Sequence, residues 1–226
     1  MDKHKKNIKK TLFIITSVAY FKDAPLNYTD KRSAFDSKTR ELQTLNTVKS
    51  IRKYARNSEI ILIESGIKKD ISPKILKAIN MYIYTGDNYF VRKACDGPKK
   101  GFGEAMSIIF GLKNIINLDT YNYIFKISGR YFLNDKFNIR SFDNVDYDFT
   151  FKKYDNPVQV STRLYGFFPS AYKIWIKAVK KSLIGLYFNK SIEQLLYKSL
   201  NKRKCNYINT LGVGGYVGPT GEEISE

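Results

Sequence analysis

Two cations close to a glycine follow an apolar run in the middle of this chain. The stretch Tyr121–Phe137 reads YNYIFKISGRYFLNDKF and contains Lys126, Ser128, Gly129 and Arg130. A glycine lets backbone N–H groups approach a ligand, and an arginine guanidinium is a planar fork of donors that matches phosphate oxygens in pairs. The pattern therefore predicts a phosphate site at these residues. The alternative is a strand whose Lys and Arg simply reach solvent.

A glycine- and lysine-rich segment, Asp96–Gly103, offers a second place for phosphate, because it opens onto a helix predicted over Glu104–Asn117. Helix N-termini carry free N–H groups and partial positive charge, so Lys100 and Gly101 are predicted to bind phosphate. An ordinary loop is the alternative. The order G-x-x-x-x-G-K-[ST] does not occur and no G-x-G-x-x-G follows the first strand, which weakens NTPase and dinucleotide-dehydrogenase interpretations.

Residues for histidine- or cysteine-based chemistry are scarce. The one histidine, His4, lies in a basic tail, which argues against a Ser-His-Asp triad, a Cys-His pair or a histidine-ligated metal. Cys95 and Cys205 form no C-x-x-C pair, so neither a zinc site nor a disulfide framework is indicated. Acid–base chemistry must then use carboxylates, tyrosine, lysine or water, and a reducing, cytoplasmic location is expected.

The charge balance calls for an anionic partner. The 226 residues carry a formal net charge of +18, and no apolar run approaches the ~20 residues of a membrane-spanning helix. Nucleic acid, an acidic lipid surface and a phosphorylated small molecule all remain open as partners. We expect a basic flexible tail over residues 1–10 and a single domain over 11–226.

Hydrophobic periodicity predicts the elements that position these residues. The first half reads as βαβαβ, the start of an open parallel sheet. Its predicted strands are Thr11–Phe21, Glu59–Glu64 and Met81–Thr85, the first of them central in the sheet. Its predicted helices are Ser37–Tyr54, with Ser37 as N-cap and an apolar stripe at Leu42, Leu45, Val48 and Ile51, and a helix from Ser72-Pro73 through Ile79.

The second half changes pattern after Asn138. Strands are predicted at Tyr147–Lys152 and Arg163–Phe168, and amphipathic helices at Ala171–Lys181 and Lys190–Leu200. The glycines of Tyr207–Glu226 are predicted not to build a packed element and to form either a mobile loop over a site or a frayed terminus.

Together these segments resemble the nucleotide-sugar-dependent glycosyltransferases of GT-A architecture, in particular small bacterial and viral members. The resemblance rests on R-x-x-Q-T at Arg40, Gln43 and Thr44 and on K-[IL]-S-G-R-Y from Lys126. It implies a single-domain α/β fold, with a mostly parallel open sheet, a Rossmann-like first half and helices on both faces. Residues 11–137 would bind the nucleotide sugar and residues 138–226 the acceptor. The implied donor-site residues beyond the central strand are Thr16, Ser17, Arg40, Lys100 and Gly101, and the implied acceptor-side residues are Arg163, Tyr165 and Glu193.

One departure from the family pattern concerns metal. GT-A enzymes commonly carry Asp-x-Asp at the end of the strand that KISGRY occupies, whereas this chain has Lys126 and Arg130 there. Both are predicted as catalytic cations that stabilise the departing diphosphate, so no cofactor is expected. The alternative is Asp146-Tyr147-Asp148, which would hold Mg²⁺ or Mn²⁺ unless it is a surface pair.

The function predicted is transfer of a sugar from a nucleotide-sugar donor to a glycan or lipid-linked acceptor. If the transfer inverts configuration, Glu193 is predicted as the base, since a carboxylate is the suitable group in the absence of a framework histidine. For Glu193 the alternative is an exposed helix glutamate paired with a lysine. The alternative is a non-catalytic basic module that binds nucleic acid. Specific nucleic-acid binding is not expected, because the basic residues are dispersed and no reader motif occurs.

A membrane contact is the remaining hypothesis, and it concerns residues 152–190. Lysines there are interleaved with aromatic residues, including Trp175 on the helix Ala171–Lys181. Such a face suits peripheral attachment to anionic lipid. The alternative is a core-packed helix with solvated lysines.

Overall fold

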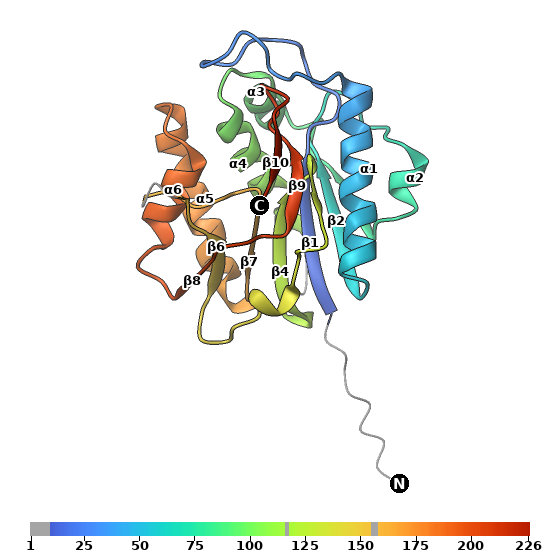
Figure 1. Cartoon of the computed structure of the whole chain (residues 1–226). Helices are drawn as coiled ribbons and strands as arrows, with labels where there is room; N and C mark the ends of the chain where they lie inside the picture. The colour runs from blue at the N-terminus through green and yellow to red at the C-terminus, as the bar shows by residue number, and fades with distance from the viewer. Residues whose placement is uncertain (1–9, 116–117, 155–157) are drawn as a thin grey trace.

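The architecture consists of two sheets flanked by helices (Figure 1), and the structure, a computed structural model, describes residues 10–115, 118–154 and 158–226. The predicted tail over residues 1–10 therefore lies almost entirely outside the described residues. In spatial order the main sheet consists of β3 (Met81–Tyr84), β2 (Ser58–Glu64), β1 (Lys10–Ser17), β4 (Tyr121–Ser128), β7 (Leu164–Phe167), β6 (Phe149–Lys152) and β8 (Cys205–Ile208). A smaller sheet contains β10 (Glu223–Ser225), β9 (Val213–Tyr216) and β5 (Tyr131–Leu133).

The helices cover both faces of the main sheet. They are α1 (Ser37–Tyr54), α2 (Pro73–Leu76), α3 (Tyr89–Asp96), α4 (Lys100–Gly111), α5 (Tyr172–Tyr187) and α6 (Ile192–Leu200), with four short 3₁₀ turns at Leu112–Asn114, Leu118–Thr120, Ile139–Ser141 and Pro169–Ala171. The α/β prediction, with a mixed but mostly parallel sheet, is confirmed.

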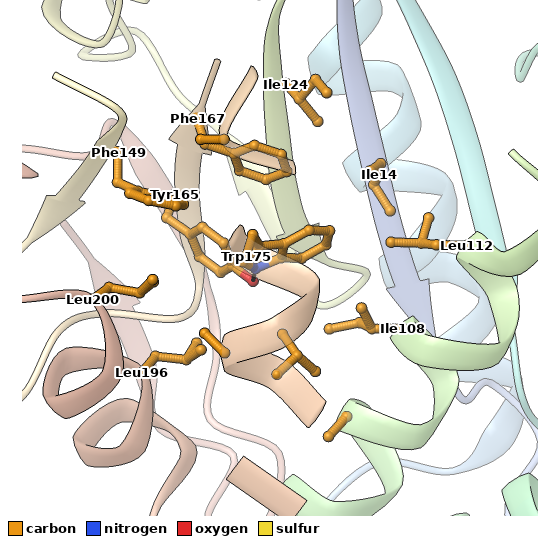
Figure 2. Close-up of a cluster of buried hydrophobic side chains, with 14 of the residues drawn as sticks. Ile14, Ile108, Leu112, Ile124, Phe149, Tyr165, Phe167, Trp175, Leu196 and Leu200 are labelled. Carbon is orange, nitrogen blue, oxygen red and sulfur yellow. Dashed lines mark hydrogen bonds between the residues drawn. The ribbon is translucent and has the colours of Figure 1, made fainter. Parts of the chain in front are cut away.

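Alternation along the strands divides the core into two clusters. On β1, Leu12 and Ile14 face a cluster shared with α4, α5 and α6, whereas Phe13 and Ile15 face a cluster shared with α1 and the small sheet. Figure 2 shows the first cluster gathered around Trp175, which is 0% exposed. Trp175 therefore takes no part in the hypothesised membrane contact, and for this residue the alternative of a core-packed helix holds.

Strand direction decides which residues can meet. Strands β1, β2 and β4 run parallel, so their carboxyl ends lie along one edge of the sheet. Strand β7 runs antiparallel to β4 with Leu164 opposite Ile127, which brings the residues preceding β7 to the same edge. Phe149, at the start of β6, pairs with Phe167 at the far end of β7, so the residues preceding β6 lie at the opposite edge.

Several predicted boundaries in the first half are wrong. The N-cap of α1 is Asp36, whose side chain accepts from the Thr39 N–H, and Leu42 is 55% exposed. Helix α2 ends at Leu76 rather than Ile79, and α3 was not predicted. Helix α4 begins at Lys100, so the segment predicted as a glycine loop is largely helical.

The prediction that residues 207–226 form no packed element is also wrong, because they contribute three strands. The glycines are required by close packing. A Cβ on Gly214 would lie 2.8 Å from the ring of Phe132, and one on Gly215, which has φ +153°, would lie 2.5 Å from the carbonyl oxygen of Arg130. Small residues here let β9 lie directly against β5.

Among the described residues, none of the helices combines the length and apolar character needed to cross a bilayer.

Candidate active site

Two adjoining cavities open at the edge where β1 and β4 end. The inner cavity is lined by the end of β1, the start of α4 and residues that follow β4, including Thr16, Ser17, Arg40 and Ser107. The outer cavity is lined by residues from the second half, including Thr162, Arg163 and Glu193, and encloses about 1110 Å³ of empty space with its open mouth counted. Lys100, Glu104, Ser128 and Arg130 line both, so the two cavities form one continuous cleft.

Besides Arg32, whose guanidinium is bonded to backbone carbonyls, three cations line the inner cavity, namely Arg40, Lys100 and Arg130. Burial lowers the pKa of Arg40 to about 9, and the neighbouring Arg130 adds to the effect. Burial, followed by repulsion from Arg130 and Arg40, holds the pKa of Lys100 well below its usual value. Within the described part of the chain, Nη1 of Arg130 is buried and has no hydrogen-bond partner. The neighbouring carboxylates Glu64, Glu104 and Glu193 offset this repulsion only in part, so the cluster favours an anion.

Helix α1 fixes the backbone that carries Arg130. Thr44 Oγ1 donates to the Gly129 carbonyl at 3.3 Å, Thr47 Oγ1 donates to the Tyr131 carbonyl at 2.7 Å, and Ser50 Oγ accepts from the Leu133 N–H at 2.9 Å. We refer to these three side chains, Thr44, Thr47 and Ser50, as the hydroxyl row. They bond to the edge of β5 that is not paired with β9. The row also explains why polar residues share the buried face of α1 with Leu45, Val48 and Ile51, the three residues of the predicted apolar stripe that are buried.

Gly129 is needed for packing rather than for binding through its own N–H. That N–H donates to the Thr16 carbonyl at 2.9 Å, and a Cβ at this position would lie 3.0 Å from Thr44 Oγ1 and 3.3 Å from Ser17 Cβ. The close approach joins the end of β1 to the start of β5. Gly129 thereby places Arg130 at the cleft, while the predicted contact between its N–H and a ligand does not fit this geometry.

Lys126 lies beneath the cleft rather than in its lining. Its side chain is 1% exposed and forms an ion pair with Glu104 on α4, and Nζ lies 3.4 Å from the Thr162 carbonyl. Burial acts to raise the pKa of the Glu104 carboxyl, but the positive charge of Lys126 lowers it below its usual value. The lysine charge is thus neutralised by a carboxylate, so the prediction that Lys126 contacts a diphosphate does not fit. It supports α4 against β4 instead.

Gly101 also has a packing role. It lies in the first turn of α4, where a Cβ would be 2.9 Å from Leu186 Cδ2 on α5. In the predicted phosphate cradle, Lys100 lines both cavities, while Gly101 lines the outer one and also lets α4 and α5 pack closely.

Arg32 organises the long connection between β1 and α1, which passes above the carboxyl edge of the sheet (Figure 1). Its guanidinium donates to the carbonyls of Ala24, Cys95, Asp96 and Gly97, at 2.6 to 3.2 Å. This fastens the connection to the end of α3 and forms one wall of the inner cavity. The sequence analysis missed Arg32, because it lies in a polar loop with no motif around it.

Glu64, at the end of β2, supports the other side of the cleft. Its Oε1 accepts from the N–H groups of Ala19 and Gly66 at 3.0 and 2.7 Å, and burial raises its pKa. It therefore holds the loop after β1 in place. The sequence analysis treated Glu64 only as the last residue of a strand.

In the outer cavity, Glu193 is the prominent carboxylate. It lies in the first turn of α6, accepts a hydrogen bond from Thr162 Oγ1 at 2.9 Å and lines the cavity, together with Tyr28, Tyr131 and Tyr154. Arg163 lines the cavity as well, but it is ion-paired with Glu226 and lies over the rings of Tyr131 and Tyr154.

Tyr165 does not belong to the cleft. It is 1% exposed within the cluster of Figure 2, its hydroxyl accepts from Trp175 Nε1 at 3.0 Å, and burial raises its pKa. The prediction of Tyr165 as an acceptor-side residue is wrong, because β7 alternates and this side chain points into the core.

The residues present do not fit a divalent metal. Asp146 and Asp148 precede β6, at the edge of the sheet opposite the cleft. In the described ranges, no group of three or more His, Cys, Asp or Glu is arranged to hold a metal ion. The carboxylates nearest the cations, Glu64 and Glu104, are engaged by backbone N–H groups and by Lys126. The end of β4 and the residues after it, Ser128, Gly129 and Arg130, therefore offer the cleft no carboxylate.

The turn between β9 and β10 covers the cation cluster. A Cβ at Gly218 would lie 1.9 Å from Arg130 Nη1 and 3.2 Å from Lys100 Nζ. The Gly218 carbonyl accepts from the Ala34 N–H at 2.8 Å, which ties this turn to the connection before α1. A residue with any side chain at 218 would occupy space that an anion on Arg130 would need.

Comparison with known proteins identifies the fold. Neither the family models nor the curated proteins match the sequence. Among solved structures, a candidate nucleotide-diphospho-sugar transferase from Desulfovibrio desulfuricans G20 matches with a TM-score of 0.50 at 10% identity, over 89% of this chain and 80% of that one. The glycosyltransferase GlyE of Streptococcus pneumoniae TIGR4 matches with a TM-score of 0.51 at 10% identity. The chain has the GT-A glycosyltransferase fold.

The extent of these matches differs. The match to GlyE covers 88% of this chain but only 45% of GlyE. A further match is the galactosyltransferase LgtC, solved in complex with donor and acceptor sugar analogues. It covers 87% of this chain and 72% of the LgtC chain, with a TM-score of 0.47 at 7% identity. At such identities the likeness concerns the GT-A fold, and the chemistry must be argued from the cleft.

Proposed function

We propose that this protein transfers a sugar from a nucleotide-sugar donor to a hydroxyl group of a glycan or lipid-linked acceptor. The observation that carries the proposal is the convergence of Arg40, Lys100 and Arg130 on one cavity, with a buried guanidinium nitrogen that lacks a partner among the described residues. A diphosphate supplies the negative charge and the hydrogen-bond acceptors that such a cluster lacks.

In this proposal the diphosphate of the donor occupies the inner cavity. When the bond between the sugar and the diphosphate breaks, negative charge grows on the leaving phosphate oxygen, and fixed cations lower the energy of that charge. Arg130 and Lys100 line both cavities, so they are suited to meet the phosphate at the junction with the acceptor space. Because the residues do not fit a metal, the cations supply the positive charge.

The acceptor occupies the outer cavity, where Glu193 serves as the base that removes the hydroxyl proton during attack on the sugar carbon. The hydrogen bond from Thr162 to Oε1 orients the Glu193 carboxylate, and among the described residues Oε2 has no hydrogen bond, which leaves it for an acceptor. The tyrosines of this cavity offer aromatic faces for sugar rings.

A donor screen tests this function. We expect one class among UDP-, GDP- and CDP-sugars to raise the melting temperature and to be hydrolysed slowly, with both effects retained in EDTA. Single-stranded oligonucleotides, at low and high salt, serve as the comparison. Stabilisation by oligonucleotides that vanishes at high salt, with no response to any sugar nucleotide, would favour the non-catalytic alternative. Loss of hydrolysis on chelation with recovery on Mn²⁺ would contradict the cationic mechanism.

A further inference from the structure

The solvent-facing side of α5 carries a continuous basic and apolar surface. Lys173, Lys177 and Lys180 lie on this exposed side at helical spacing, and the same side continues into the last turn of the helix. There Ile184, Tyr187 and Phe188 are 72%, 60% and 69% exposed. Large apolar side chains exposed together are uncommon on a surface that meets only water. We refer to these six residues as the α5 face.

The charge on this surface has one sign. Helix α5 contains no Asp or Glu, and Lys181 and Lys190 extend the positive charge beside the α5 face. Lysines next to aromatic and aliphatic side chains match the boundary of a membrane, where the rings lie at headgroup level and the ammonium groups meet lipid phosphates. This arrangement favours a lipid surface over nucleic acid, since Ile184 would gain nothing from a phosphate backbone.

The α5 face borders the mouth of the outer cavity. Lys99, which lines that cavity, donates from Nζ to the Tyr187 carbonyl and lies 4.0 Å from the centre of the Tyr187 ring. Leu186, Asn189 and Lys190 line the same cavity. Figure 1 shows α5 and α6 on the side of the molecule opposite α1 and α2. A surface that contacts the α5 face would therefore lie beside the opening of the outer cavity.

We propose that the α5 face docks the protein on membranes that carry anionic phospholipids. The docking itself requires only the lysines and the exposed apolar residues. Its consequence rests on the function proposed above: the acceptor hydroxyl would reach the outer cavity from the membrane surface, which favours a lipid-linked acceptor over a free glycan.

Vesicle co-sedimentation with the full chain tests the docking. We expect binding to phosphatidylglycerol–phosphatidylcholine vesicles at about 0.05 M salt and release at about 0.5 M, because salt screens exposed charges. Each lysine near an anionic surface contributes roughly fivefold to the partition coefficient. The triple variant Lys173→Glu, Lys177→Glu and Lys180→Glu should therefore bind at least about 100-fold more weakly. Ile184→Ser with Phe188→Ser should weaken binding about tenfold and leave its salt dependence in place.

A matched control separates docking from the attraction of net charge alone. Lys49→Glu, Lys74→Glu and Lys77→Glu change the charge equally on exposed positions of α1 and its neighbour α2, and this variant should bind within a few-fold of the wild type. Equal losses in the two triple variants, or no binding of the wild type at low salt, would overturn the proposal. Nucleoside diphosphate affinity is measured separately on the α5 variants and should not change, so failure of the docking and failure of the transferase function give different results.

Discussion

Replacement of Arg130 by alanine should separate activity from stability. Nη1 of Arg130 has no partner among the described residues, and the variant relieves repulsion on Arg40 and Lys100 while it removes an attraction to Glu104. Because these effects oppose each other, we expect the free energy of unfolding to change by no more than about 1 kcal/mol. A guanidinium that meets a leaving diphosphate contributes far more, about 3–4 kcal/mol in the transition state, so kcat/KM should fall about 10²–10³-fold.

The assay is transfer or donor hydrolysis, measured alongside thermal unfolding of the same preparations. Arg130→Lys should recover only part of the lost activity, because a point charge lacks the planar fork. Arg140→Ala, at an exposed arginine, is the matched control and should leave kcat/KM unchanged. A collapsed melting temperature with nearly unchanged kcat/KM in Arg130→Ala would refute the reasoning and make Arg130 a structural residue.

Three further predictions concern the same cleft. Glu193→Gln should lower kcat about 10²–10⁴-fold while donor affinity, measured by calorimetry, stays within a few-fold; equal loss of both would argue against a base. Because the pKa of Lys100 is lowered in the free protein and a bound diphosphate would raise it, binding should take up protons. Nucleoside diphosphate affinity should then fall as pH rises above that lowered pKa, and Lys100→Met should flatten this dependence of affinity on pH. Without ligand, the free energy of unfolding should rise with pH between the lowered pKa and the pKa of an unfolded lysine, near 10.5. Gly218→Ala should displace the flexible end of Arg130 at little cost in melting temperature and lower kcat/KM at least about tenfold, whereas unchanged kinetics would show that the turn does not touch the reacting groups.

The first half of the fold was predictable because its strands are apolar on both faces. Strand β1 and helix α1 agree with the prediction to within a few residues, since a buried parallel strand and a long helix leave strong periodic signals. Helix α3 was missed because it has only eight residues, about two turns, although Val91, Ala94 and Cys95 are buried at helical spacing.

Cleft residues were predictable from the sequence only where a cation follows a strand end or begins a helix. Arg130 and Lys100 belong to it, as a cationic site at a strand end and a helix start suggested. Lys126 was misplaced because strand alternation points it toward α4, where Glu104 neutralises it, and no local pattern reveals a partner 22 residues away. The same applies to Arg32, whose bonds reach carbonyls more than 60 residues along the chain.

The hydroxyl row on α1 has a consequence for assembly. A strand with one open edge is a template on which another chain can add a strand, and proteins usually protect such edges with charge, proline or a covering element. Here Thr47 and Ser50 occupy the open edge of β5 with side-chain bonds that a second backbone would otherwise make. A change of Thr47 to valine keeps the shape and removes the bond, so it would leave the Tyr131 carbonyl unsatisfied beneath α1. The hydroxyl row that holds the cleft in register thus also closes the open edge of β5, with α1 as the covering element.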